Sequence, residues 1–286
     1  NVHLIPKDEV FAAESWTRVH GDWKQRLAPF YGLAQRMLGV TKSRYENAAD
    51  EALQETARRM GREHTYQRVN TGVLFPEDPD DASGAKRGDP YFDGDGPERN
   101  SCQYCGGCTM GCRHNAKNTL VKNYLWFAER NGVEIRAESE VTRIEALPDA
   151  KGQRDGSAGY EITVQSSTAW FAKKPYRLRC RGLVLSAGVF GTIPLLLKAR
   201  DQDQTLPRLS SRLGREVRTN SETLIVNTAR FADASGQPQE ICHGPTITSM
   251  FDPDDETRIE INRFPRYGDA TFALQSAVPL TDTHGQ

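Results

Sequence analysis

The chain has 286 residues, of which 37% are apolar and 26% charged, and its mean hydropathy is -0.64. This composition is typical of a globular protein that can bury a sizeable core, and no run of residues is apolar enough to predict a transmembrane segment. The 37 basic and 38 acidic residues leave a net charge of -1, which excludes a global positive field that would attract nucleic acid.

The first hundred residues are predicted to be helical and then irregular. Apolar residues recur at three- and four-residue steps over residues 16–40, which predicts amphipathic helix, and Pro29 is expected to start a second helix there rather than to lie inside one. A further helix is predicted over residues 48–60, with Met60 on its apolar face. Residues 76–100 are rich in proline, glycine and aspartate without an apolar period, so they are predicted to form a long surface loop.

The middle of the chain is predicted to alternate between helices and strands. A helix is expected over residues 116–131, followed by short strands at 133–137, 141–146, 160–165 and 176–180. Residues 182–188 form an apolar run that ends in Ser186, Ala187 and Gly188, which predicts a strand buried on both faces of a parallel sheet. A helix over residues 192–200 is expected behind that strand.

Beyond residue 220 the pattern changes to alternating strands, predicted at 223–228, 246–251, 257–262 and 271–277. The change predicts a boundary between two domains near residue 219. The fold class expected is therefore mixed α/β (α+β), with part of a Rossmann-like domain followed by part of an antiparallel-sheet domain. The Gly-x-Gly-x-x-Gly fingerprint of a dinucleotide site follows none of the predicted strands.

Four of the six cysteines, Cys102, Cys105, Cys108 and Cys112, lie within eleven residues. Cysteines this crowded rarely reach disulfide geometry, so a secreted disulfide framework is excluded and a reducing, cytoplasmic compartment is favoured. Structurally packed thiols are one interpretation of the cluster, and it is the one that the family resemblance given below implies.

Iron–sulfur ligation is the alternative interpretation of these four cysteines, because C-x2-C-x2-C-x3-C is the spacing that ferredoxins use. Against it, Arg113 replaces the usual proline, and a single local cluster would need Cys180 or Cys242 as its fourth ligand. Zinc is disfavoured, because paired zinc ligands need a longer spacer between the pairs.

Several blocks of the sequence resemble the glucose-methanol-choline (GMC) flavin oxidoreductases, in their cholesterol oxidase-like branch. In chain order the blocks are Asn1-Val2-His3-Leu4 with the apolar residues of 23–40, CGGCTMGC at 105–112 with 116–125, residues 185–192, and Leu213-Gly214 with Thr219-Asn220. They occur in the family's order along nearly the whole chain. Val189 and Ile193 depart from the family's commoner Ala and Pro.

The resemblance implies flavin adenine dinucleotide (FAD) as cofactor and oxidation of an alcohol, either a sterol or another bulky hydroxyl compound. A base would take the hydroxyl proton, a hydride would pass to the flavin, and O2 or a carrier would accept the electrons. By position, it implies FAD contacts at Asn1, Val141 and the three residues Ser186, Ala187 and Gly188.

The same resemblance implies a domain organisation. Residues 1–100 would be the helical region and long loop next to the flavin and substrate, 101–219 part of the FAD-binding domain, and 220–286 part of the substrate domain. The family's amino-terminal fingerprint and its catalytic His and Asn are expected outside this sequence, so the chain is interpreted as the middle of a longer enzyme. An iron–sulfur dehydrogenase subunit and an inert, incompletely folded piece are the alternatives.

No catalytic base is assigned from the sequence. His114, His243 and Glu260 are titratable candidates, but each is as readily explained as a surface or hydrogen-bonded structural group.

Overall fold

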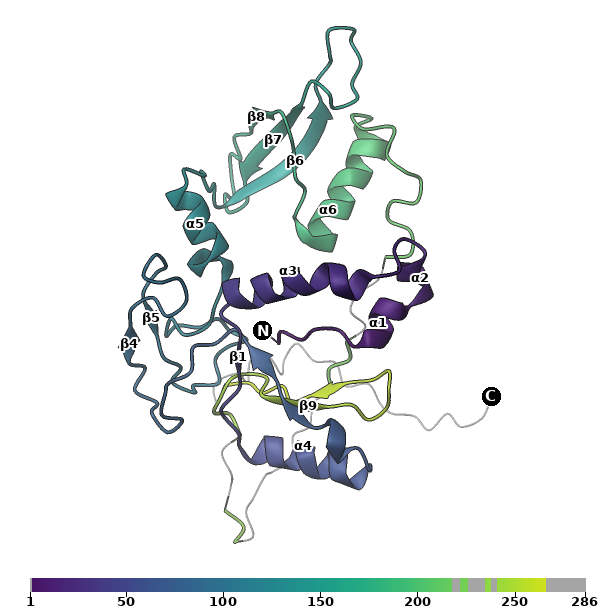
Figure 1. Cartoon of the computed structure of the whole chain (residues 1–286). Coiled ribbons are helices and arrows are strands. Elements are labelled where there is room, and N and C mark those ends of the chain that lie inside the picture. Colours follow the sequence, from purple (N-terminus) through teal and green to yellow (C-terminus); the bar gives the residue numbers. More distant parts are fainter. Residues whose placement is uncertain (1, 218–221, 226–234, 238–240, 266–286) are drawn as a thin grey trace. The chain divides into compact units, whose positions relative to one another are not determined.

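The structure is a computed structural model of the chain that describes residues 2–217, 222–225, 235–237 and 241–265. Figure 1 traces its elements from helix α1 (Asp8–Ala12) to strand β10 (Ile259–Glu260). The chain divides into two compact units, one made of Asn1–Val133 with Thr228–Gln286 and the other of Glu134–Asn227. The chain after the second unit returns to pair with the first.

The first unit begins with three helices, α1, α2 (Glu14–Thr17) and α3 (Trp23–Met37). Their contact is aromatic: the Phe11 ring lies 6.5 Å from Trp16 and 6.2 Å from Tyr31, both edge to face. Pro29 lies inside α3, so the prediction that it starts a second helix was wrong. An exposed helix tolerates this proline because water can satisfy the carbonyl that loses its N–H partner.

Helix α4 (Ala48–Arg59) confirms the helix predicted over residues 48–60. It begins with a capping box. The Asn47 side chain accepts a hydrogen bond from the Ala49 N–H at 3.0 Å, and the Asn47 N–H donates to Asp50 at 3.0 Å. Leu53 and Ala57 are buried against Phe251. Met60, which was predicted to face inward, is 52% exposed because it lies beyond the last helical turn.

Helix α4 covers a small antiparallel sheet in which β9 (Ser249–Phe251) lies between β10 and β2 (Gln67–Arg68). The β9–β10 hairpin confirms the predicted strands at 246–251 and 257–262, although both are shorter than expected. Strand β2 was not predicted. The predicted strand at 271–277 and the end of that at 223–228 lie outside the described residues, and residues 222–225 are not in a strand.

Shorter elements complete the first unit. They are β1 (Thr41–Lys42) paired with β3 (Asn70–Thr71), β4 (Lys86–Arg87) paired with β5 (Arg99–Asn100), the 3-10 turns Glu63–Thr65 and Leu120–Lys122, and helix α5 (Tyr124–Arg130). Apart from β4 and β5, residues 76–100 form the predicted loop. The helix predicted over 116–131 is reduced to Leu120–Lys122 and α5, because the segment before Leu120 is extended and packs as part of the cysteine loop.

The second unit is the predicted β-meander, with β6 (Ser139–Ala146), β7 (Tyr160–Ser166) and β8 (Tyr176–Cys180) paired antiparallel in that order. Helix α6 (Gly188–Leu197) continues into a π-helical turn, Lys198–Gln202, and contacts β6 (Figure 1). Ile144, Ala146 and Val164 of the sheet are buried. No strand forms at 133–137.

The strand predicted over residues 182–188 does not form either, and Val184 in its middle is 87% exposed. A parallel strand needs neighbours that hydrogen-bond to it, and none of the described segments pairs with this one. The fold among the described residues is therefore mixed helix with antiparallel sheet, and no helix there is both long and apolar enough to cross a bilayer.

Candidate functional site

The cysteine loop, residues 102–117, is held on one side by the segment 242–246. The Gly244 N–H donates to the Tyr104 carbonyl at 2.7 Å, and Cys105 forms a parallel bridge with Gly244. Further along, the hydroxyls of Thr109 and Thr246 are 3.1 Å apart. A loop without regular structure is thus fixed by contacts between residues more than a hundred positions apart.

Glycine is required where these two segments meet. Gly106 has a φ of +71°, and a Cβ added there would lie 2.0 Å from the Cys242 carbonyl oxygen. A side chain at Gly106 would therefore push the segments apart. Gly107, by contrast, has ordinary φ, and its nearest neighbour to an added Cβ is the Cys105 sulfur at 3.5 Å.

The inner side of the loop belongs to a hydrophobic core. Cys102, Tyr104 and Ala116 are buried with Val73 and Phe75. The Tyr104 ring also stacks on Tyr45 with centroids 4.7 Å apart. Burial raises the pKa of the Cys102 thiol to about 12 and that of the Tyr104 phenol to about 12. Both groups are therefore neutral packing groups, as the interpretation of structural thiols expects for Cys102.

Cys112 lies in a different electrostatic environment. Burial by itself raises its pKa, but the backbone N–H groups of Lys117, Ala116 and His114 outweigh burial, and the charge of Lys122 adds to them. The net result is a thiol pKa below the ordinary value, because these groups stabilise the thiolate. The loop therefore separates one unreactive thiol from one with increased anionic character.

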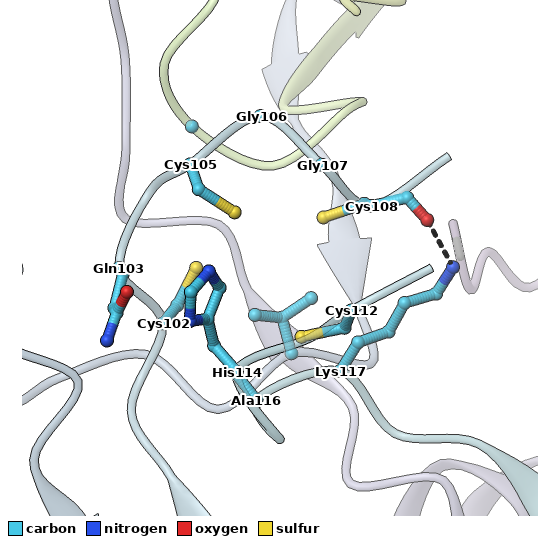
Figure 2. Close-up of a pocket in the computed structure, with 12 residues that line it drawn as sticks. Cys102, Gln103, Cys105, Gly106, Gly107, Cys108, Cys112, His114, Ala116 and Lys117 are labelled. Carbon is cyan, nitrogen blue, oxygen red and sulfur yellow. Dashed lines mark hydrogen bonds between the residues drawn. The ribbon is translucent and has the colours of Figure 1, made fainter. Parts of the chain in front are cut away.

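All four clustered cysteines line one small hollow, together with His114 and Lys117 (Figure 2). The Lys117 ammonium donates to the Cys108 carbonyl at 2.9 Å. The hollow has a volume of about 10 Å³, which is room for a single water molecule. It is too small for a flavin ring or an organic substrate.

Iron–sulfur ligation is not favoured by this geometry. Within the part of the chain that the structure describes, no three His, Cys, Asp or Glu side chains converge as a metal site would require. Cys180, one candidate for the fourth ligand, lies in β8 of the other unit. None of the six cysteines, all of which lie in the described part of the chain, is in a disulfide. The iron–sulfur interpretation therefore rests on the spacing alone.

A second hollow of about 180 Å³ shares Val73, Cys108 and Lys117 with the first. Its walls also carry three hydroxyls and an amide, from Thr71, Thr109, Thr246 and Asn262. The Thr71 hydroxyl oxygen is buried and has no hydrogen-bond partner within the described residues. No sequence motif marks this group of residues, because they come from four separate segments.

The predicted FAD contacts at Val141 and at residues 186–188 lie in the second unit. Asn1 lies outside the described residues. Val141 is half-buried in β6, opposite Val164, beside a bulge in the strand. Ser186, Ala187 and Gly188 are exposed at the start of α6, where the Ala187 N–H donates to the Thr192 hydroxyl at 3.2 Å. Because α6 contacts β6, the structure places these predicted residues on two adjoining elements.

The residues at the start of α6 fit a contact with a cofactor but do not enclose one. Gly188 has a φ of +67° and open space where a Cβ would be, so a ligand could approach its backbone closely. Val184 and Phe190 on either side are 87% and 91% exposed, which leaves apolar surface to be covered. Neither the cysteine hollow nor the larger hollow beside it is lined by these positions.

The titratable candidates are dispersed. His114 is half-buried in the wall of the cysteine hollow, His243 is exposed, and Glu260 lies in β10. The His243 carbonyl accepts hydrogen bonds from Asn47 and Arg263, which gives that residue a structural role through its backbone. No catalytic base emerges from this arrangement.

Comparison with known proteins gives consistent matches. A profile described as GMC oxidoreductase matches residues 96–200. The chain is similar to a cholesterol oxidase of Acinetobacter baumannii, with 38% identity over 94% of this chain and 47% of the relative. It is also similar to a cholesterol oxidase of Mycobacterium tuberculosis, with 37% identity over 100% of this chain and 47% of the relative. The chain thus spans about half the length of these curated relatives, and no solved structure matches it.

Proposed function

Because this chain belongs to the GMC oxidoreductase family, we propose that its protein catalyses the FAD-dependent oxidation of an alcohol. The observation that carries the proposal is the position of the profile match. Residues 96–200 include the cysteine loop, β6 with Val141, and the start of α6 with Ser186–Ala187–Gly188. Both described segments with predicted FAD contacts therefore lie inside the matched region.

When bound, the flavin would supply the acceptor for the hydride of the alcohol. The contribution of this chain would be to hold the cofactor. Ser186, Ala187 and Gly188 offer exposed backbone with small side chains, and Val141 offers the backbone of a strand whose place is fixed by pairing with β7. The apolar side chains of Val184 and Phe190 would exclude water from that contact once it is covered.

The proposed substrate is a sterol or another bulky alcohol. This choice rests on the two relatives, which are both called cholesterol oxidases. The electron acceptor would be O2 or a carrier. The helices and loop of residues 1–100 are proposed to lie next to the flavin and substrate, and residues 220–286 to contribute to the substrate domain.

The full-length protein encoded by the gene tests the proposal. We expect the purified protein to show the resolved blue absorption bands of an oxidised flavin, and these bands to bleach when a sterol is added without oxygen. A long-chain primary alcohol serves as the second substrate. Absence of bound flavin, or a flavin that neither alcohol reduces, would contradict the proposal.

A pair of glycine variants tests the predicted cofactor contact. Gly188→Val places a branched side chain where the backbone is proposed to approach FAD and where φ is +67°, so we expect it to lose flavin during gel filtration. Gly182→Val is the matched control, because Gly182 has open space around it and ordinary φ. Equal flavin content in both variants would remove Gly188 from the proposed site.

A further inference from the structure

The sulfurs of Cys105 and Cys108 point toward one another across the cysteine hollow (Figure 2). The two residues enclose Gly106 and Gly107. The left-handed φ of +71° at Gly106 reverses the chain there, and the Met110 N–H closes the following turn on the Gly107 carbonyl at 3.1 Å. An added Cβ at Gly107 would lie 3.5 Å from the Cys105 sulfur, so that sulfur lies over the turn, on the side of Cys108.

Cysteines this close in sequence rarely reach disulfide geometry, but the conformation of this loop makes a Cys105–Cys108 disulfide feasible. Two cysteines three positions apart reach bridging geometry only when the chain between them curls, and two glycines permit that curl. The flanks of the pair are also held in place, by the Gly244 N–H on the Tyr104 carbonyl at 2.7 Å and the Lys117 ammonium on the Cys108 carbonyl at 2.9 Å. Little conformational freedom remains to be lost on closure.

Access distinguishes this pair from Cys102, and hydrogen bonding distinguishes it from Cys112. Cys105 is exposed and Cys108 is half-buried, so a small oxidant can reach both. Cys102 is buried in the core with Val73 and Phe75. Cys112 is half-buried like Cys108, but the backbone N–H groups of His114, Ala116 and Lys117 donate hydrogen bonds to its sulfur.

We propose that Cys105 and Cys108 are an oxidation site, at which a hydroperoxide converts the two thiols reversibly into a disulfide. One thiolate attacks the hydroperoxide, the O–O bond breaks, and a sulfenic acid and water (or an alcohol) form. The second thiol then attacks the sulfenic sulfur and releases water. With hydrogen peroxide, two thiols and one peroxide give one disulfide and two waters, so the two electrons lost by sulfur reduce the peroxide oxygens. This site is independent of the proposed alcohol oxidation.

Peptide mapping of the whole protein tests the proposal. Trypsin releases residues 100–113 as one peptide that carries all four clustered cysteines, because no Lys or Arg lies between Arg99 and Arg113. Protein is treated with hydrogen peroxide or with dithiothreitol, denatured, alkylated and digested. We expect four alkyl groups on this peptide from reduced protein and two from oxidised protein, located on Cys102 and Cys112. Dithiothreitol should restore all four.

Two serine variants separate this pair from its neighbours. Cys112→Ser should still lose two alkylated thiols on oxidation, falling from three to one. Cys108→Ser should keep both Cys102 and Cys112 alkylated and form no disulfide within this peptide. Three outcomes would each overturn the proposal. They are four alkyl groups after oxidation, a disulfide that includes Cys112, and a sulfinic acid at Cys105 that dithiothreitol does not reverse.

Discussion

Two apolar segments of this chain have opposite environments. In β9, Met250 and Phe251 are 1% and 0% exposed, whereas at the start of α6 Val184 and Phe190 are 87% and 91% exposed. The first segment pairs with β10 on one side and β2 on the other, and α4 covers it. The second has no strand partner among the described residues.

The difference teaches that an apolar sequence specifies a need for burial but not the partner that satisfies it. Strand β9 pairs with β10, which is close to it in the sequence, and with β2, which is far from it in the sequence. One local and one remote contact therefore fix its position. Residues 182–188 were predicted to need neighbours on both sides, and the described part of the chain supplies neither. The exposed apolar surface is where we propose that the cofactor region is completed.

The largest expected effect comes from replacing one phenylalanine in each segment, Phe251 in β9 and Phe190 in α6, and comparing the stabilities of the two variants. Phe251→Ala removes a ring that is 0% exposed, so we expect a loss of about 3–5 kcal/mol of unfolding free energy from the transfer and cavity costs. Phe190→Ala removes a ring that is 91% exposed and should change stability by less than about 0.5 kcal/mol. Hydrogen exchange followed by mass spectrometry measures each region separately. Similar losses for the two variants would show that Phe190 is buried in solution.

A buried ion pair extends the comparison from apolar to charged side chains. Arg263 donates to the Asp50 carboxylate at 2.8 Å, and their side chains are 5% and 1% exposed. The hydroxyls of Thr248 and Ser249 donate to the same carboxylate. Arg263 also bonds to the His243 and Pro245 carbonyls, so this pair supports the segment that holds the cysteine loop.

Arg263→Met should leave the Asp50 carboxylate buried without its countercharge. We expect a loss of about 3 kcal/mol, at the lower end for a broken buried pair because the two hydroxyls remain as donors. The control is Arg212→Met in the second unit, whose pair with Glu216 is exposed and should be worth at most about 0.5 kcal/mol. Urea unfolding monitored by fluorescence compares the two variants. Equal midpoints would mean that Arg263 does not stabilise the first unit.

The smallest expected effect concerns pH and the thiols of the cysteine loop. A lowered pKa means that Cys112 carries more thiolate at a given pH than an ordinary cysteine, whereas the pKa of about 12 keeps Cys102 protonated. The rate of alkylation of Cys112 should therefore rise at lower pH than that of cysteine in an unstructured peptide. The rate at Cys102 should still be rising at the highest pH measured. A Cys112 midpoint at or above that of the peptide would contradict the proposed effect of the backbone N–H groups.

Local signals in the sequence were sufficient for several elements. The helical spacing of apolar residues over 48–60 predicts α4, and the short strands at 141–146, 160–165 and 176–180 predict the meander, because helical periodicity and hairpin pairing act between near neighbours. The prediction for Pro29 failed because the rule that proline breaks a helix takes no account of solvent exposure. Helix α3 is exposed, so water can replace the hydrogen bond that Pro29 cannot donate. The predicted FAD contacts remain predictions.

The sequence by itself determined the family, through blocks in a fixed order, and the gathering of four thiols in one loop, through their spacing. Only the tertiary structure decided what each thiol is. Burial with Val73 and Phe75 raises the pKa of Cys102, the N–H groups of His114, Ala116 and Lys117 lower that of Cys112, and the turn at Gly106 and Gly107 points the sulfurs of Cys105 and Cys108 toward one another. The segments that bury Cys102 and hold the loop are far apart in the chain, so a thiol's chemistry depends on its surroundings rather than on its position in a motif.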